Sequence, residues 1–434
     1  MKFQFPLPVL QKPRLPEPLM AIVRKFSAPR DAAPLAFLPI HQPSKAELVE
    51  RVKIPVNNAS LRLKGDSEMR EQGQFLARQE RWDRLSDRIR EADQARERTN
   101  QGTPVSELML FGARADVVSA GEHALLHGKP ARDSNFFEGI EDFEEVLTEF
   151  PDDYAIALIV AHMHIDIGWA WRGTVAEADL HHTNREAFVA HFARAEEILD
   201  RFSAHELNSP ALSAARCALL PGIEHPGDRI ADDFEDLIDL DPKNPRHMRA
   251  LGTYMLPRWY GDHAALDLQA RRTAARTYDL WGAGAYTWVW FDALLTDPTG
   301  LEHLDTDYFL DGAFEILERR PDQATANLLA AQIYCAWQAS RQHYRDTGAG
   351  TQQSAALRKG FEQVIQNHLR EVHPLIWGHA ELGFDNGVRS VSIERLAQKG
   401  RDFAMTAVAQ PFIKGLEAGT TIHFGPDGIT EIQP

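Results

Sequence analysis

The stretch from residue 231 to 290 most constrains the fold, because a proline separates two runs whose apolar residues recur at helical spacing. The first run ends at Pro242, and its apolar residues share one helical face. These are Phe234, Leu237 and Ile238. Asn244 and Pro245 then signal a helix start, since asparagine caps a first turn and proline is tolerated there. The second run repeats at offsets of 3, 6 and 7 through Met248, Leu251, Tyr254 and Met255. We expect a helical hairpin whose second helix closes at Arg258 and Gly261.

The same pattern occurs three times along the chain. The segments FEEVLTEFP, FEDLIDLDP and AFEILERRP end at Pro151, Pro242 and Pro321, and an alanine-rich helical run follows each one. The prolines are 91 and then 79 residues apart, so the copies do not form a regular array with a period of about 34 residues. The pattern predicts an all-α protein, an irregular stack of helical hairpins related to an α-solenoid.

Other segments have the same periodicity. Residues 67–97 read as two helices with a turn near Gln79, and further helices are predicted over 136–150 and 154–171. A helical region that begins after residue 103 is expected to be interrupted or kinked where Gly112 and Gly121 fall.

Three regions are predicted from composition. Residues 1–60 hold ten of the 25 prolines and nine basic against four acidic residues, which indicates an extended basic arm, either free or partly docked on the acidic body. A short helix is predicted within it, from Ser44 to Val52. Residues 61–410 form the helical body. Residues 411–434 form a tail in which GPDG joins two alternating apolar runs as a β-hairpin.

The composition of the 434 residues, 44% of them hydrophobic, indicates a folded, soluble protein. A formal net charge of −16 disfavours nucleic acid and anionic lipid as partners. The N-terminus lacks the features of a secretory signal, and Cys217 and Cys335 suit buried free thiols. We therefore expect a cytoplasmic protein that binds neither nucleic acid nor membranes.

The sequence HMHID places His162 and Asp166 on one face of a helix and His164 about 200° away. A regular helix cannot direct all three at one metal ion. We therefore expect histidines that make ordinary hydrogen bonds, without metal or cofactor. The alternative is a metal site to which His181 and His182 add ligands to His162 and Asp166.

Aromatic and arginine residues are concentrated between residues 169 and 291. Packing between helices explains most such aromatics, but tryptophan, tyrosine and arginine also dominate binding energy at protein interfaces. The hypothesis of a partner-binding surface names nine of these residues. They are Trp169, Trp171, Arg258, Trp259, Tyr260, Arg271, Arg272, Trp281 and Trp288.

The segments WAWRG and FEDLIDLDPKNPRHMRALGTYMLPRWYGDH, together with the helix that follows, resemble an uncharacterised family of bacterial helical proteins near the tetratricopeptide-like superfamily. The resemblance covers about residues 136–295 and implies a fold of helical hairpins. It implies no activity and no catalytic residues.

Together these observations predict a non-enzymatic scaffold for protein–protein interaction. The partner would be a protein or peptide, with an acidic segment if the arginines contribute. The alternative is a helical metal-dependent hydrolase centred on His162, Asp166, His181 and His182. The sequence leaves the oligomeric state open.

Overall fold

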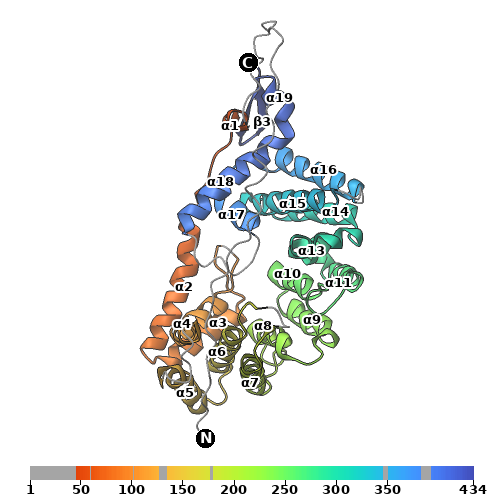
Figure 1. Cartoon of the computed structure of the whole chain (residues 1–434). Helices are drawn as coiled ribbons and strands as arrows, with labels where there is room; N and C mark the ends of the chain where they lie inside the picture. The colour runs from red at the N-terminus through yellow and green to blue at the C-terminus, as the bar shows by residue number, and fades with distance from the viewer. Residues whose placement is uncertain are drawn as a thin grey trace, which may run out of the picture. The chain divides into compact units, whose positions relative to one another are not determined.

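The computed structural model describes residues 45–58, 60–100, 102–126, 134–175, 179–345, 350–382 and 392–434 (Figure 1). Helices account for 74% of the described residues, and a small three-stranded sheet is the other regular element. The predicted all-α class and the short C-terminal hairpin are confirmed. The arm from residue 1 to 43 lies outside the described residues.

The helices follow one another along the chain with short connections (Figure 1). Their bounds are α1 Lys45–Glu50, α2 Ser60–Arg78, α3 Trp82–Gln94, α4 Val105–Leu126, α5 Ser134–Glu149, α6 Tyr154–Arg172, α7 His182–Leu199, α8 Pro210–Leu219, α9 Ile230–Leu240, α10 Pro245–Tyr254, α11 His263–Arg276, α12 Tyr278–Trp281, α13 Gly284–Thr296, α14 Thr306–Arg319, α15 Gln323–His343, α16 Thr351–Asn367, α17 Pro374–Leu382, α18 Ile393–Ala409 and α19 Ile413–Glu417.

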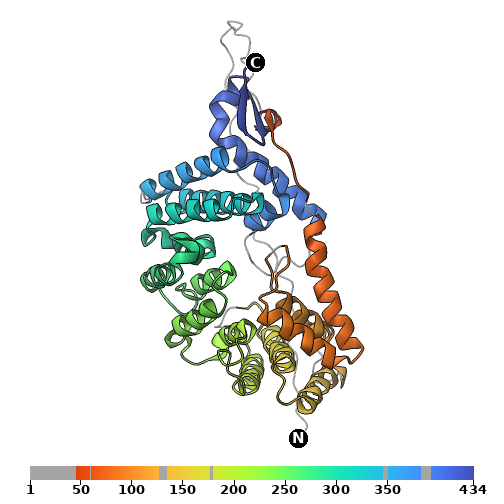
Figure 2. The same cartoon turned by 180° about the vertical axis from the view of Figure 1, so that it is seen from behind.

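Each repeated proline segment joins two helices, as predicted. The pairs are α5 and α6, α9 and α10, and α14 and α15. The second helix of each pair begins after a capping side chain. Asp153 accepts from the backbone N–H groups of residues 155 and 156, Asn244 from that of residue 246, and Asp322 from that of residue 325. The repeats are therefore structural units. Helices α14, α15 and α16 lie side by side in both views (Figure 2).

The predicted interruption of α4 and the predicted end of α10 were wrong. Helix α4 runs without interruption through Gly112. This glycine instead allows α2 to approach, because a Cβ atom there would lie 1.9 Å from the carbonyl oxygen of Arg70. Helix α10 ends at Tyr254, before the predicted stop at Arg258 and Gly261. The missed signal is Pro257, which cannot continue a helix.

The small sheet joins the two ends of the described chain. Strand β1 (Val52–Lys53) pairs in parallel with β2 (Thr421–Gly425), and β2 pairs antiparallel with β3 (Gly428–Ile432). Helix α1 confirms the helix predicted from Ser44 to Val52, whereas β1 was not predicted. A two-residue strand has too little alternation to be recognised in sequence.

Helix α6 is the one described helix that is long and apolar enough to cross a membrane. However, 72% of its most apolar window is buried inside the protein. It packs against α4 and α7, and residues from Tyr154 to Ala161 are all buried. This burial is what a core helix of a soluble protein has.

Candidate functional site

The predicted partner-binding residues separate into buried and exposed groups. Trp281 and Trp288 are each 2% exposed and pack edge to face, with ring centroids 5.9 Å apart. The indole N–H of Trp281 donates to the carbonyl oxygen of Pro242 at 2.7 Å. Both tryptophans therefore belong to the core, where a partner cannot contact them without unfolding the helices around them.

Arg271 stabilises the fold. Its guanidinium group lies 2.8 Å from Asp267 and 3.1 Å from Asp305, and it lies over the ring of Tyr286 at 5.3 Å. The hydrogen bond to Asp267 is the main reason that the pKa of Arg271 is raised. The adjacent Arg272 is exposed and has no polar partner among the described residues. The two arginines, predicted together, therefore have different roles.

Trp169 packs inside an aromatic cluster, 5.2 Å from Phe188 and 6.0 Å from Phe192 by ring centroids. Trp171, at the end of the same helix, is partly buried. Helix α6 ends next to it at Gly173, which has a φ of 62° that favours glycine. These two tryptophans offer less surface to a partner than the sequence indicated.

The connection between α10 and α11 carries an aromatic pair of which one member, Trp259, is exposed. Trp259 is 41% exposed, and the guanidinium of Arg258 lies 5.5 Å from its ring centroid. Tyr260 is partly buried beside Trp259, with ring centroids 5.9 Å apart. Burial raises the pKa of Tyr260, and the nearby charge of Arg172 opposes that rise. Arg172, at the end of α6, is therefore close enough to Tyr260, in the connection after α10, for its charge to act on the phenol.

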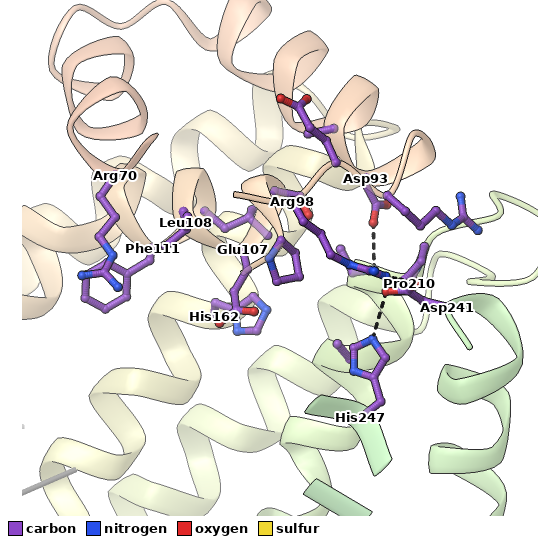
Figure 3. A pocket seen from close by; sticks show the side chains of 18 of the residues that line it. Arg70, Asp93, Arg98, Glu107, Leu108, Phe111, His162, Pro210, Asp241 and His247 are labelled. Carbon is purple, nitrogen blue, oxygen red and sulfur yellow. Dashed lines mark hydrogen bonds and ion pairs between the residues drawn. The ribbon is translucent and has the colours of Figure 1, made fainter. Parts of the chain in front are cut away.

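A cavity of about 270 Å³ lies among α3, α4, α6 and α8 (Figure 3). Helix α4 contributes one wall, which includes Phe111 and Arg114, and α6 contributes His162. The connection between α3 and α4 and the turn between α9 and α10 complete the lining with Arg98 and Asp241. Elements up to about 180 residues apart in sequence thus meet at one pocket, and this is why no local pattern predicted it.

His162 is the part of HMHID that faces this pocket. Burial and the positive charge of Arg114 lower the pKa of His162 to about 3, so its imidazole is neutral at pH 7. Its ring nitrogens have no hydrogen-bond partner among the described residues. Asp166, one turn later on α6, forms an ion pair with Arg114 at 2.7 Å. Asp166 is thus already paired with an arginine.

The polar edge of the pocket is an ion-pair network. Arg98 and His247 both bond the carboxylate of Asp241, and the His247 distance is 3.3 Å (Figure 3). Burial alone would raise the pKa of Asp241, but these hydrogen bonds lower it below its usual value. The Nε–H of Arg98 is buried and has no hydrogen-bond partner among the described residues.

Asp93 forms a second polar contact at the pocket. Its carboxylate accepts from the hydroxyl of Ser209 and, at 3.0 Å, from the backbone N–H of Ala211 in the first turn of α8. Burial raises the pKa of Asp93, while these hydrogen bonds reduce that rise. This carboxylate therefore fixes α8 against α3.

His164 lies outside the pocket, in a buried network that the sequence did not indicate. Its Nε2 lies 2.9 Å from Glu144 and its Nδ1 lies 2.9 Å from Nδ1 of His191. Arg194 makes two hydrogen bonds to Glu144, and these are the main reason that the pKa of Glu144 falls to about 2. Burial and the charge of His164 lower the pKa of His191 to about 4. The network joins α5, α6 and α7.

The residues named for the alternative metal site do not converge. His181 and His182 lie at the exposed start of α7, where their rings contact each other at 4.4 Å. Among the described residues, no group of three or more histidine, cysteine, aspartate and glutamate side chains could hold a metal ion. The geometry therefore does not favour the hydrolase alternative.

Comparisons of the chain with protein-family models, with curated proteins and with solved structures found no match. The resemblance to the uncharacterised bacterial helical family therefore stays a prediction. The fold defines the class of protein, which is an all-α protein of paired helices.

Proposed function

We propose that this protein is a non-enzymatic interaction scaffold in the cytoplasm, of the tetratricopeptide-like kind, and that it binds a protein or peptide partner through the surface of Arg258, Trp259 and Tyr260. The observation that carries the proposal is the exposure of Trp259. Among the six tryptophans between residues 169 and 290, Trp259 is the exposed one, and it lies on a connection between helices.

Tryptophan and arginine are residue types enriched at the energetic centres of interfaces. The ring of Trp259 already lies near the guanidinium of Arg258, at 5.5 Å, and near the ring of Tyr260, at 5.9 Å. A partner would therefore bind a surface that loses little side-chain entropy.

An acidic partner segment fits the positive charge of Arg258, which has no carboxylate within ion-pair distance among the described residues. The overall charge of −16 argues against nucleic acid as the partner.

The test is affinity purification from the host followed by mass spectrometry, with Trp259→Ala compared with Phe75→Ala. Phe75 is 62% exposed and lies on α2, so it is a matched change of an exposed aromatic residue. We expect a specific partner to be lost from Trp259→Ala and kept by Phe75→Ala. Equal recovery of every co-purifying protein by both variants would contradict the proposal.

A further inference from the structure

We propose that the pocket among α3, α4, α6 and α8 binds a small free carboxylic acid with an apolar body. This site is separate from the proposed function at Trp259, and the lining itself carries the proposal. The pocket has an apolar wall, an arginine without an ion pair among the described residues, Arg70, and a neutral histidine with open hydrogen-bonding capacity, His162 (Figure 3).

The apolar wall comes from three helices. Its members are Ala92, Leu108, Leu110, Pro210, Ala211 and Ala214. Leu108 and Leu110 are each 2% exposed, so they are fixed by the core behind them. An apolar ligand group placed against this wall would leave water at a gain of about 25 cal/mol per Å².

Most of the acidic groups at the pocket are already paired with basic side chains. The pairs are Arg98 with Asp241, Arg246 with Glu107 at 2.9 Å, and Arg88 with Glu97 at 2.7 Å. Asp93 is committed to Ser209 and the N-terminus of α8. None of these carboxylates forms an ion pair with Arg70, another arginine of the lining.

Arg70 lines the pocket from α2. Its guanidinium lies 5.4 Å from the ring centroid of Phe111, and it has no ion pair with any described residue. Arg96 differs, because it donates to the carbonyl of Leu240 at 3.1 Å and to the side chain of Asn208 at 2.6 Å, and its charge acts on the carboxylate of Asp93. A ligand carboxylate beside Arg70 would meet a positive charge that no described carboxylate pairs with.

His162 adds a hydrogen bond without adding charge. Because its imidazole is neutral, one ring nitrogen donates and the other accepts, and the protein satisfies neither. A ligand carboxylate can accept the N–H of this ring. The buried and unpartnered Nε–H of Arg98 is a second donor at the same pocket.

The size of the cavity selects the ligand. A cavity of about 150 Å³ holds benzene, with six carbon atoms, so 270 Å³ holds about eleven non-hydrogen atoms. That is the size of 3-phenylpropionate. A peptide end with its side chains and backbone is larger, so we assign the site to a free acid.

The test is isothermal titration calorimetry of the full chain with 3-phenylpropionate and with its uncharged amide. We expect the acid to bind with a dissociation constant below about 1 mM and the amide at least about fivefold more weakly. Absence of binding by the acid at about 10 mM, or equal binding of acid and amide, would overturn the proposal. Tighter binding of the peptide acetyl-Ala-Ala-Leu than of the acid would overturn the free-acid assignment.

Three variants locate the site. Arg70→Gln should weaken binding of the acid by about fivefold and leave the amide unchanged, whereas Arg272→Gln, also an exposed arginine without a carboxylate partner, should change neither. Ala214→Leu should fill the wall and abolish binding of both. The helical circular dichroism signal confirms that each variant is folded. Unchanged binding of the acid by folded Arg70→Gln or Ala214→Leu would refute the site.

Discussion

The buried amide of Asn327 gives the sharpest test of how the C-terminal half is held together. Asn327 is fully buried on α15 and makes four hydrogen bonds. Its Nδ2 donates to the carbonyl oxygens of Gln323 at 2.7 Å and Glu371 at 2.9 Å. Its Oδ1 accepts from the backbone N–H of His373 at 2.9 Å and from the indole N–H of Trp377 at 2.8 Å. One side chain thus fixes α15 to the start of α17.

Replacement of Asn327 by leucine keeps the approximate size and removes all four bonds. At a net value of about 0.5–1.5 kcal/mol for each bond, the loss is about 2–6 kcal/mol, and the added apolar burial returns about 1 kcal/mol. The indole of Trp377 is itself 0% exposed, so water cannot replace the lost acceptor. We therefore expect a decrease in the free energy of unfolding of about 1–5 kcal/mol, toward the upper end because the indole N–H is left without an acceptor.

The assay is urea unfolding followed by circular dichroism, together with hydrogen exchange at the amide of His373. The control is Asn367→Leu, the same change at an exposed position on α16, which should alter stability by less than about 0.5 kcal/mol. Faster exchange at His373 is expected only in Asn327→Leu. If that variant is within about 1 kcal/mol of the parent chain, the amide does not hold these elements together and the reasoning is refuted.

Further changes test other contacts. Gly112→Ala should lower the free energy of unfolding in urea by about 2 kcal/mol or more, because its Cβ would lie 1.9 Å from a backbone oxygen. Gly65→Ala is the control on α2, where the space around the glycine is open, and it should stabilise the protein slightly. Arg271→Glu should lower the melting temperature, because it faces two aspartates, and Arg272→Glu should not. For His162, the pKa of about 3 in the folded state lies below the ordinary 6.5, so the unfolded state takes up the proton first and stability falls between about pH 6.5 and 3. Between pH 7 and pH 4.5 this titration should lower the free energy of unfolding by about 2–3 kcal/mol. The measurement is urea unfolding of the parent chain and of His162→Gln at both pH values, because the variant lacks the titrating imidazole.

Local signals in the sequence predicted the helix ends well. The turn near Gln79 lies where α2 ends, and the helix predicted from Tyr154 begins there because Asp153 caps it. Such signals act within a few residues, so one sequence contains them. The predicted end of α10 was wrong because Pro257, a strong local stop, ends the helix before Arg258.

The pocket and the buried network could not be predicted in this way. Asp93 meets Ser209 across 116 positions, and Arg194 meets Glu144 across 50. Such pairs depend on which helices pack together, and helical periodicity does not specify that. The periodicity indicates only which face of each helix is buried. It predicts that charged residues at the edge of that face are exposed to solvent, even where they pair with another helix.

The surplus of aromatic and arginine residues in the central region has a structural explanation at the turn of Pro242. The indole of Trp281 donates to the carbonyl of Pro242, and Arg320 lies 4.3 Å from the centroid of that indole. Arg320 also donates to the carbonyl of Lys243 at 3.2 Å, and Arg96 reaches the carbonyl of Leu240 from the connection after α3. Carbonyl groups left open where one helix ends are thus satisfied by side chains from other connections. Trp281 is therefore used inside the fold at this turn and is not available to a partner. The binding surface predicted from these residue types is correspondingly smaller, and its exposed part lies around Trp259. The proposed partner would bind there.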